Sequence, residues 1–168
     1  RDRVEGVSRE LKVQTEDLPE RIAQLSEKLR AAEKEIETLR KQQLAARASE
    51  FVSAAKDING FKVVALTLPE GTTGGDLRTV ATDLRNRLRE EEAVIVLGAE
   101  DKGKFPFIAA ATDKAVGRGV KSGDIVKEFG QYVDGRGGGK PDMAQGSGST
   151  AAGAERGFAA VKDMLESL

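Results

Sequence analysis

The apolar residues of the chain change their spacing near residue 60, and this change divides it into two parts. Before that point they recur at alternating steps of four and three, at Leu18, Ile22, Leu25, Leu29, Ala32, Ile36 and Leu39. This is the a/d spacing of an amphipathic helix, kept for roughly three heptads. After it come short runs of β-branched and apolar residues, which are typical of strands. The sequence therefore predicts a helical, coiled-coil-like subdomain over residues 1–59 and a globular subdomain over residues 60–168.

Three of these short runs predict the strands of the globular part, at residues 61–68, 93–99 and 104–111. The segment Asp101-Lys102-Gly103 between the last two is typical of a hairpin turn. A second helical pattern from Leu44 is expected to end at Asn59-Gly60, because this pair commonly stops a helix.

Further helices are expected in the globular part, each beginning at a residue that can cap its first turn. These caps are Asp76, Ser122, and either Ser149 or Thr150. The predicted fold class is α/β, with an N-terminal helical or coiled-coil stalk followed by a small mixed-sheet α/β domain. A glycine-rich loop is expected before the last helix.

The composition excludes several kinds of protein. Cysteine and histidine are both absent, which removes thiol nucleophiles, Ser-His-Asp relays and almost every zinc, copper or haem site. The 27 Lys and Arg residues nearly balance 28 Asp and Glu residues, so a strongly cationic coat protein is excluded. No apolar run approaches a membrane span, so we expect no membrane partner and a cytoplasmic location. Because the chain begins at Arg1, we expect a piece of a longer protein.

One segment offers chemistry, the glycine-rich stretch over residues 134–148. Its glycines expose successive backbone N–H groups that can form a concave anion site, and Arg136 and Lys140 flank the triplet Gly137-Gly138-Gly139. Residues 114–140 carry six basic and three acidic side chains in a chain of net charge −1. Phosphate binding is the functional interpretation, and a flexible solvated loop is the alternative.

A second basic group lies on the helix that follows Asp76, at Arg78, Arg85, Arg87 and Arg89. The known nucleotide motifs do not fit the glycine-rich stretch. A Walker A loop needs glycine and Ser or Thr where Asp134 and Pro141 stand, and no GxGxxG follows the first strand. Aromatic residues are few, so backbone or shape recognition is favoured over base stacking.

The heptad stripe has two open interpretations. It is either the seam of a self-associating coiled coil or a face that packs on another helix of the same longer protein. In a parallel dimer its flanking pairs, Lys28–Glu33 and Glu35–Arg40, are opposite in charge. The candidate oligomerisation residues are Ile22, Leu25, Leu29, Ile36 and Leu39.

The string GGGKPDMAQ at residues 137–145 resembles the signature near the C-terminus of the alanyl-tRNA synthetase family, in its DHH-associated domain. The Leu-Pro-Glu-Arg-Ile start of the stalk at residues 18–22 and the β-α-β-β-α order are also similar, so the resemblance covers essentially the whole chain. Two departures are Gly146-Ser147-Gly148, where the family usually has Ala-Gly-Gly, and Asp134, where it commonly has glycine.

This resemblance implies a non-catalytic C-terminal fragment that binds the outer corner of tRNA(Ala) and supports aminoacylation and editing by the parent enzyme. Implied partners are the catalytic and editing domains of the parent chain and a second copy through the stalk. ATP, Mg and Zn belong to the parent family, and no cofactor is expected in this fragment. The candidate RNA-binding residues are Lys114, Arg118, Lys121, Arg136, Gly137, Gly138, Gly139, Lys140 and Gln145.

Two other functions remain open at this point. The chain is alternatively a coiled-coil self-association module, or the substrate-binding domain of a DHH-type phosphoesterase that would need a metal-bearing partner domain.

Overall fold

The computed structural model describes residues 2–168, which divide into two compact units, one extending to Gln43 and the other spanning Leu44–Leu168. The first unit contains the helix α1 (Asp2–Glu10), the short 3₁₀ helix η1 (Thr15–Asp17) and the start of α2 (Leu18–Ser53). No helix among the described residues is both long and apolar enough to cross a membrane.

The predicted heptad stripe lies on α2, and most of it is open to solvent. Ile22, Leu29, Ile36 and Leu39 are 49%, 61%, 63% and 52% exposed. Leu25 is partly buried and Leu18 is buried. Within the described residues the stripe therefore has no extensive apolar cover.

The second unit is built on a mixed sheet of six strands in the order β1-β2-β3-β4-β6-β5. The strands are β1 (Lys56–Ile58), β2 (Phe61–Leu68), β3 (Ala93–Ala99), β4 (Phe105–Ala111), β5 (Arg136–Gly139) and β6 (Met143–Gly148). Only β2 and β3 are parallel, and the other neighbours are antiparallel. The predicted α/β fold class is confirmed, and the three strands predicted from apolar runs are present.

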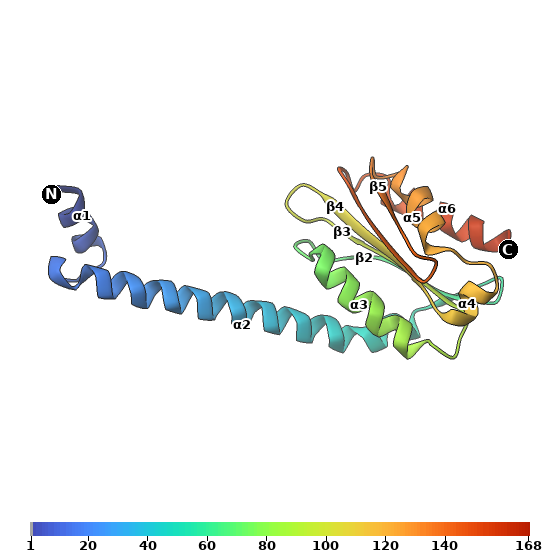
Figure 1. The fold of residues 1–168 in the computed structure, drawn as a ribbon, viewed down its shortest axis with the longest axis horizontal. Helices are drawn as coiled ribbons and strands as arrows, with labels where there is room; N and C mark the ends of the chain where they lie inside the picture. The colour runs from blue at the N-terminus through green and yellow to red at the C-terminus, as the bar shows by residue number, and fades with distance from the viewer. Residues whose placement is uncertain (1) are drawn as a thin grey trace. The chain divides into compact units, whose positions relative to one another are not determined.

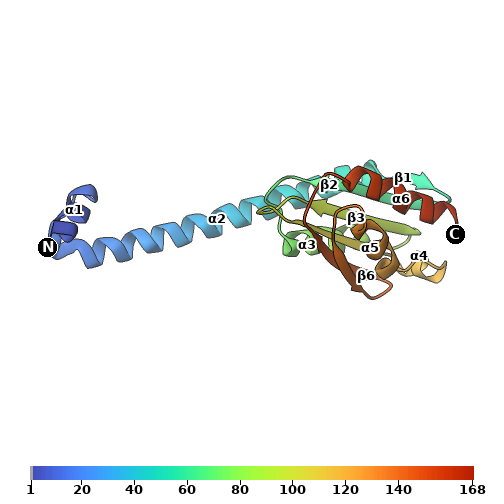
Figure 2. The ribbon, with the colours of Figure 1, turned by 90° about the horizontal axis from the view of Figure 1, so that it is seen from above.

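Helices cover both faces of this sheet (Figure 1). The helix α3 (Gly74–Arg87) and the last turns of α2 bury one face around Leu77, Leu84 and Ile95. The helices α5 (Ser122–Gly130) and α6 (Ala154–Glu166) bury the other, and α6 runs beside β1 and β2 (Figure 2). A short helix, α4 (Asp113–Gly117), follows β4.

Aromatic side chains hold the α5–α6 face together. The Phe129 ring lies 5.0 Å from both the Phe107 and Phe158 centroids and 6.3 Å from that of Phe105, and all four side chains are buried. Such pairs contribute roughly 0.5–1.5 kcal/mol each beyond burial of their area. The helix that carries Phe129 is therefore fixed firmly against β4.

The expected end of the second helical pattern was wrong. The helix α2 ends at Ser53, and Asn59-Gly60 forms the turn of a β1–β2 hairpin with φ values of 52° and 84°. Positive φ at both central residues is the geometry of a type I′ turn. The Asn-Gly pair is strongly preferred in this turn, so it can mark a hairpin as well as the end of a helix. The Asn59 side-chain amide then donates to the carbonyl of Leu165, near the end of α6 (3.1 Å).

The expected helix caps were also misplaced. Thr73 caps α3. Asp76, the third residue of this helix, completes a capping box because its carboxylate accepts from the Thr73 N–H at 3.1 Å. Lys121 precedes α5 and Gly153 precedes α6, without side-chain capping bonds. The glycine-rich stretch is not a loop, because it forms the β5–β6 hairpin.

Candidate functional site

The β5–β6 hairpin is held at its turn by its own main-chain bonds and by two neighbouring elements, α5 and β4. Lys140 and Met143 bond each other through their main chains, at 2.9 and 3.3 Å, and close a turn around Pro141 and Asp142. The Pro141 carbonyl accepts from the N–H of Ser122, the first residue of α5, at 2.9 Å. The Asp142 carbonyl accepts from Ala111 N–H at the end of β4, also at 2.9 Å. The hairpin therefore has a fixed position on the sheet.

Two of its glycines serve different purposes. A Cβ on Gly137 would lie 2.3 Å from the Gln145 carbonyl and 2.6 Å from Val126 Cγ1, so only glycine allows α5 to pack on β5. A Cβ on Gly138 would have no atom within 4 Å. Because successive residues of a strand face opposite sides, Gly138 points away from α5 into open space.

That open space is a groove of about 340 Å³ between α3 and the hairpin. We call it the α3–hairpin groove, and its lining residues are Arg78, Arg85, Gly138, Gly139, Lys140, Asp142, Met143, Ala144 and Gln145. Its lining carries three basic side chains and one acidic one, a net charge of +2. Arg136 is exposed two residues before Gly138, on the same side of the strand.

Polar contacts fix both arginines of α3 in the groove. Arg78 Nη1 donates to Gln145 Oε1 at 3.3 Å, and Gln145 Nε2 donates to the Gly74 carbonyl at 3.3 Å. Arg85 Nη1 donates to the Asp142 carbonyl at 3.3 Å and lies 3.4 Å from the Asp142 carboxylate. The groove thus presents preformed guanidinium donors beside a strand with little side-chain bulk, an arrangement suited to anions such as phosphate.

The structure brings together six of the nine residues expected to bind RNA. Arg136, the glycine triplet, Lys140 and Gln145 all lie on the hairpin. Sequence reasoning grouped Arg78 and Arg85 as a separate basic helix, and no local pattern signals that α3 faces β6. Asp142 was not expected to belong to a phosphate site.

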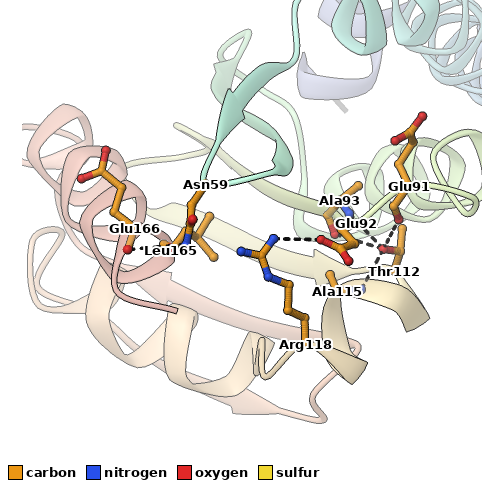
Figure 3. Close-up of polar contacts among 9 residues, drawn as sticks. All are labelled: Asn59, Glu91, Glu92, Ala93, Thr112, Ala115, Arg118, Leu165 and Glu166. Carbon is orange, nitrogen blue, oxygen red and sulfur yellow. Dashed lines mark hydrogen bonds and ion pairs between the residues drawn. The ribbon is translucent and has the colours of Figure 1, made fainter.

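Lys114 and Arg118 are engaged elsewhere. Lys114 Nζ donates to the Glu90 carbonyl at 2.8 Å. Arg118 Nη1 contacts Glu92 Oε2 at 2.8 Å (Figure 3). The guanidinium carbon of Arg118 also lies 4.1 Å from the Phe61 ring centroid. The Glu90 carboxylate, 3.6 Å from Lys114 Nζ, and the Glu92 carboxylate partly neutralise these two cations. Lys121 is exposed directly before Ser122, beside the hairpin turn.

Residues 2–168 contain no group of three or more His, Cys, Asp or Glu side chains arranged to hold a metal ion. The acidic residue of the groove, Asp142, faces an arginine instead of another carboxylate.

The described fold is a small, partly parallel sheet that carries a glycine-rich hairpin beside a basic helix. The chain belongs to the DHHA1 domain family, which matches residues 60–167. It is 52% identical to the alanine–tRNA ligase of Corynebacterium efficiens over 166 residues, which are 98% of this chain and 19% of that protein. It is 53% identical to the alanine–tRNA ligase of Corynebacterium jeikeium over 162 residues, 96% of this chain and 18% of that protein.

Two solved structures share the fold. The C-Ala domain of Aquifex aeolicus alanyl-tRNA synthetase superposes with a TM-score of 0.61 at 22% identity, over 67% of this chain and 97% of that one. RecJ from Thermus thermophilus, in complex with Mg²⁺, gives 0.55 at 20% identity over 77% of this chain and 18% of that one. The expected resemblance to the C-terminal region of alanyl-tRNA synthetases is confirmed.

Proposed function

We propose that this chain is the tRNA-binding module of an alanine–tRNA ligase and that the α3–hairpin groove holds the phosphate backbone of tRNA(Ala). The observation that carries the proposal is the net positive groove beside Gly138, in a chain 52% identical to such a ligase. The chain spans 19% of that ligase's length. It would act in the cytoplasm and support aminoacylation and editing, which the catalytic and editing domains of the parent chain would perform.

Each residue has a distinct role in the proposed interface. Arg136 and Lys140 carry the exposed charge on the hairpin, and Gly138 leaves room for the backbone to approach. Gln145 acts through its contact with Arg78. The resulting contacts are with phosphates, so recognition would depend on the shape of the tRNA more than on its bases.

The three remaining candidate residues differ in whether they already have a partner in the structure. Lys121 is exposed beside the hairpin turn and extends the basic surface. Lys114 and Arg118 already contact Glu90 and Glu92, so we propose a smaller contribution from them. The proposed function needs no cofactor in this chain, and the ATP, Mg and Zn of the family would act in the other domains.

The double variant Arg136→Ala with Lys140→Ala tests the proposal. Losing two phosphate contacts should weaken tRNA binding and reduce the salt slope of log K by about 1.4–1.8. The pair Arg89→Ala with Lys162→Ala removes the same charge outside the groove and should leave the slope nearly unchanged. A double hairpin variant with a normal melting curve and an unchanged salt slope would sink the phosphate-binding proposal.

The exposed stripe of α2 supports self-association as a second candidate function. Ile22, Leu29 and Ile36 are each at least 49% exposed, and an apolar stripe of this spacing is typical of a coiled-coil seam. Light scattering over a range of concentrations distinguishes a homodimer through this helix from a monomer. The two functions involve different surfaces, and both can hold in one chain.

A further inference from the structure

We infer that Asp142 restrains binding in the α3–hairpin groove, because its carboxylate occupies the place on Arg85 that a phosphate of the RNA would take. This inference rests on the proposed function of the groove. It assigns the one acidic side chain in the groove lining to competition with the ligand.

The geometry of the pair supports competition over a rigid structural role. Arg85 Nη1 lies 3.4 Å from Asp142 Oδ2, longer than the roughly 2.7–2.9 Å of a strong charge-assisted bond. The two side chains are 26% and 48% exposed, so water reaches both. Exposed pairs of this kind are generally weak, so a phosphate that contacts Arg85 can displace the carboxylate.

The position of Asp142 is set by its main chain and not by its carboxylate. Its carbonyl accepts from the N–H of Ala111 and from Arg85, and the turn around it is closed by Lys140 and Met143. An Asp142→Asn substitution keeps these contacts and the side-chain size, and it removes only the charge. The fold of the hairpin should therefore survive it.

A competing carboxylate raises the number of contacts that a ligand needs. An isolated anion has to displace Asp142 with the energy of a single contact. A folded RNA also contacts Arg78, Lys140 and Arg136, so it offsets the same cost with several contacts at once. The cost is the same for every ligand that reaches Arg85, so it lowers each affinity by one common factor and leaves only ligands with several contacts bound at low concentration.

The test compares wild type, Asp142→Asn and a control, Asp83→Asn, in the full chain. Asp83 pairs with Arg87 at 3.1 Å and is not part of the groove lining, so the control makes the same change in net charge elsewhere. Fluorescence titrations measure affinity for tRNA and for a short single-stranded oligonucleotide. Asp142→Asn should bind both tRNA and the oligonucleotide about threefold to tenfold more tightly than wild type, because either ligand then reaches Arg85 without displacing a carboxylate.

The double variant Asp142→Asn with Arg85→Ala tests whether the gain in affinity depends on Arg85. The gain should disappear, because the freed guanidinium is its source. Unchanged or weaker binding by a well-folded Asp142→Asn variant would overturn the inference, as would the same gain in Asp83→Asn.

An RNA-free measurement separates this inference from the proposed function. In an NMR titration with inorganic phosphate, the Arg85 Nε–H signal should shift at lower phosphate in Asp142→Asn than in wild type. If it does so while no variant binds tRNA, the competition stands and the proposed function fails. If it responds equally in both proteins, the competition fails even when tRNA binds.

Discussion

A carboxylate placed at residue 138 should weaken RNA binding in the groove without disturbing the fold. In the structure a Cβ on Gly138 meets no atom within 4 Å, and the residue is exposed on β5. A side chain added there extends into the groove, close to Arg78 and Arg85, which line it as well. Gly138→Glu therefore adds charge and bulk at the centre of the proposed interface.

The size of the effect follows from Coulomb's law. A carboxylate about 5 Å from a bound phosphate repels it by about 0.8 kcal/mol at the dielectric constant of water and about 3 kcal/mol at an effective value of about 20. This corresponds to binding roughly 4-fold to more than 100-fold weaker. Stability should change by no more than about 0.5 kcal/mol, since the site is exposed and glycine is a poor strand residue.

The assay is a tRNA titration at several salt concentrations beside a thermal melt. Gly138→Gln has nearly the same size without the charge and separates repulsion from bulk. Gly138→Glu should bind more weakly than Gly138→Gln, and the difference should shrink as salt rises. A folded Gly138→Glu protein that binds tRNA like wild type would show that the groove is not the interface.

Three further predictions concern packing and assembly. Gly137→Ala should lower stability by about 1–3 kcal/mol, because its Cβ would fall 2.3 Å from the Gln145 carbonyl, and an unchanged melting temperature would refute the close packing. Phe129→Ala should cost about 3–5 kcal/mol in chemical denaturation, and a loss below about 1 kcal/mol would contradict the central role of this ring. Leu29→Asp should give a folded monomer if the α2 stripe pairs two chains, whereas equal masses for both proteins by light scattering would exclude that role.

The sequence predicts the apolar strands well because their signal is local. The run at Ala93–Ala99 is entirely buried, as its composition indicates. The strand β5 carries no such signal, since Arg136 and three glycines have low strand propensity. Its stability comes from pairing with β6 and from the contact of Gly137 with Val126, both of which are tertiary.

The candidate site likewise has one part that the local sequence indicates and another part that only the tertiary structure brings together. The basic, glycine-rich segment could be predicted as a candidate site because Arg136, Lys140 and the glycines are neighbours in sequence. The arginines of α3 lie far from the hairpin in sequence, and they reach it only because β6 pairs with β4 and α3 packs on that face. Lys114 is closer in sequence to the hairpin residues, yet its partner is Glu90. Local charge density therefore indicates a site but does not identify all of its members.

The salt dependence of tRNA binding by the whole chain tests the central claim most directly. Four basic side chains, Arg78, Arg85, Arg136 and Lys140, lie in or beside the groove. If each neutralises one phosphate, log K should fall against log salt concentration with a slope of about −3 to −3.5. A measurable affinity with that slope is the predicted result. The absence of binding at low salt, or binding with a slope near zero, would contradict the account.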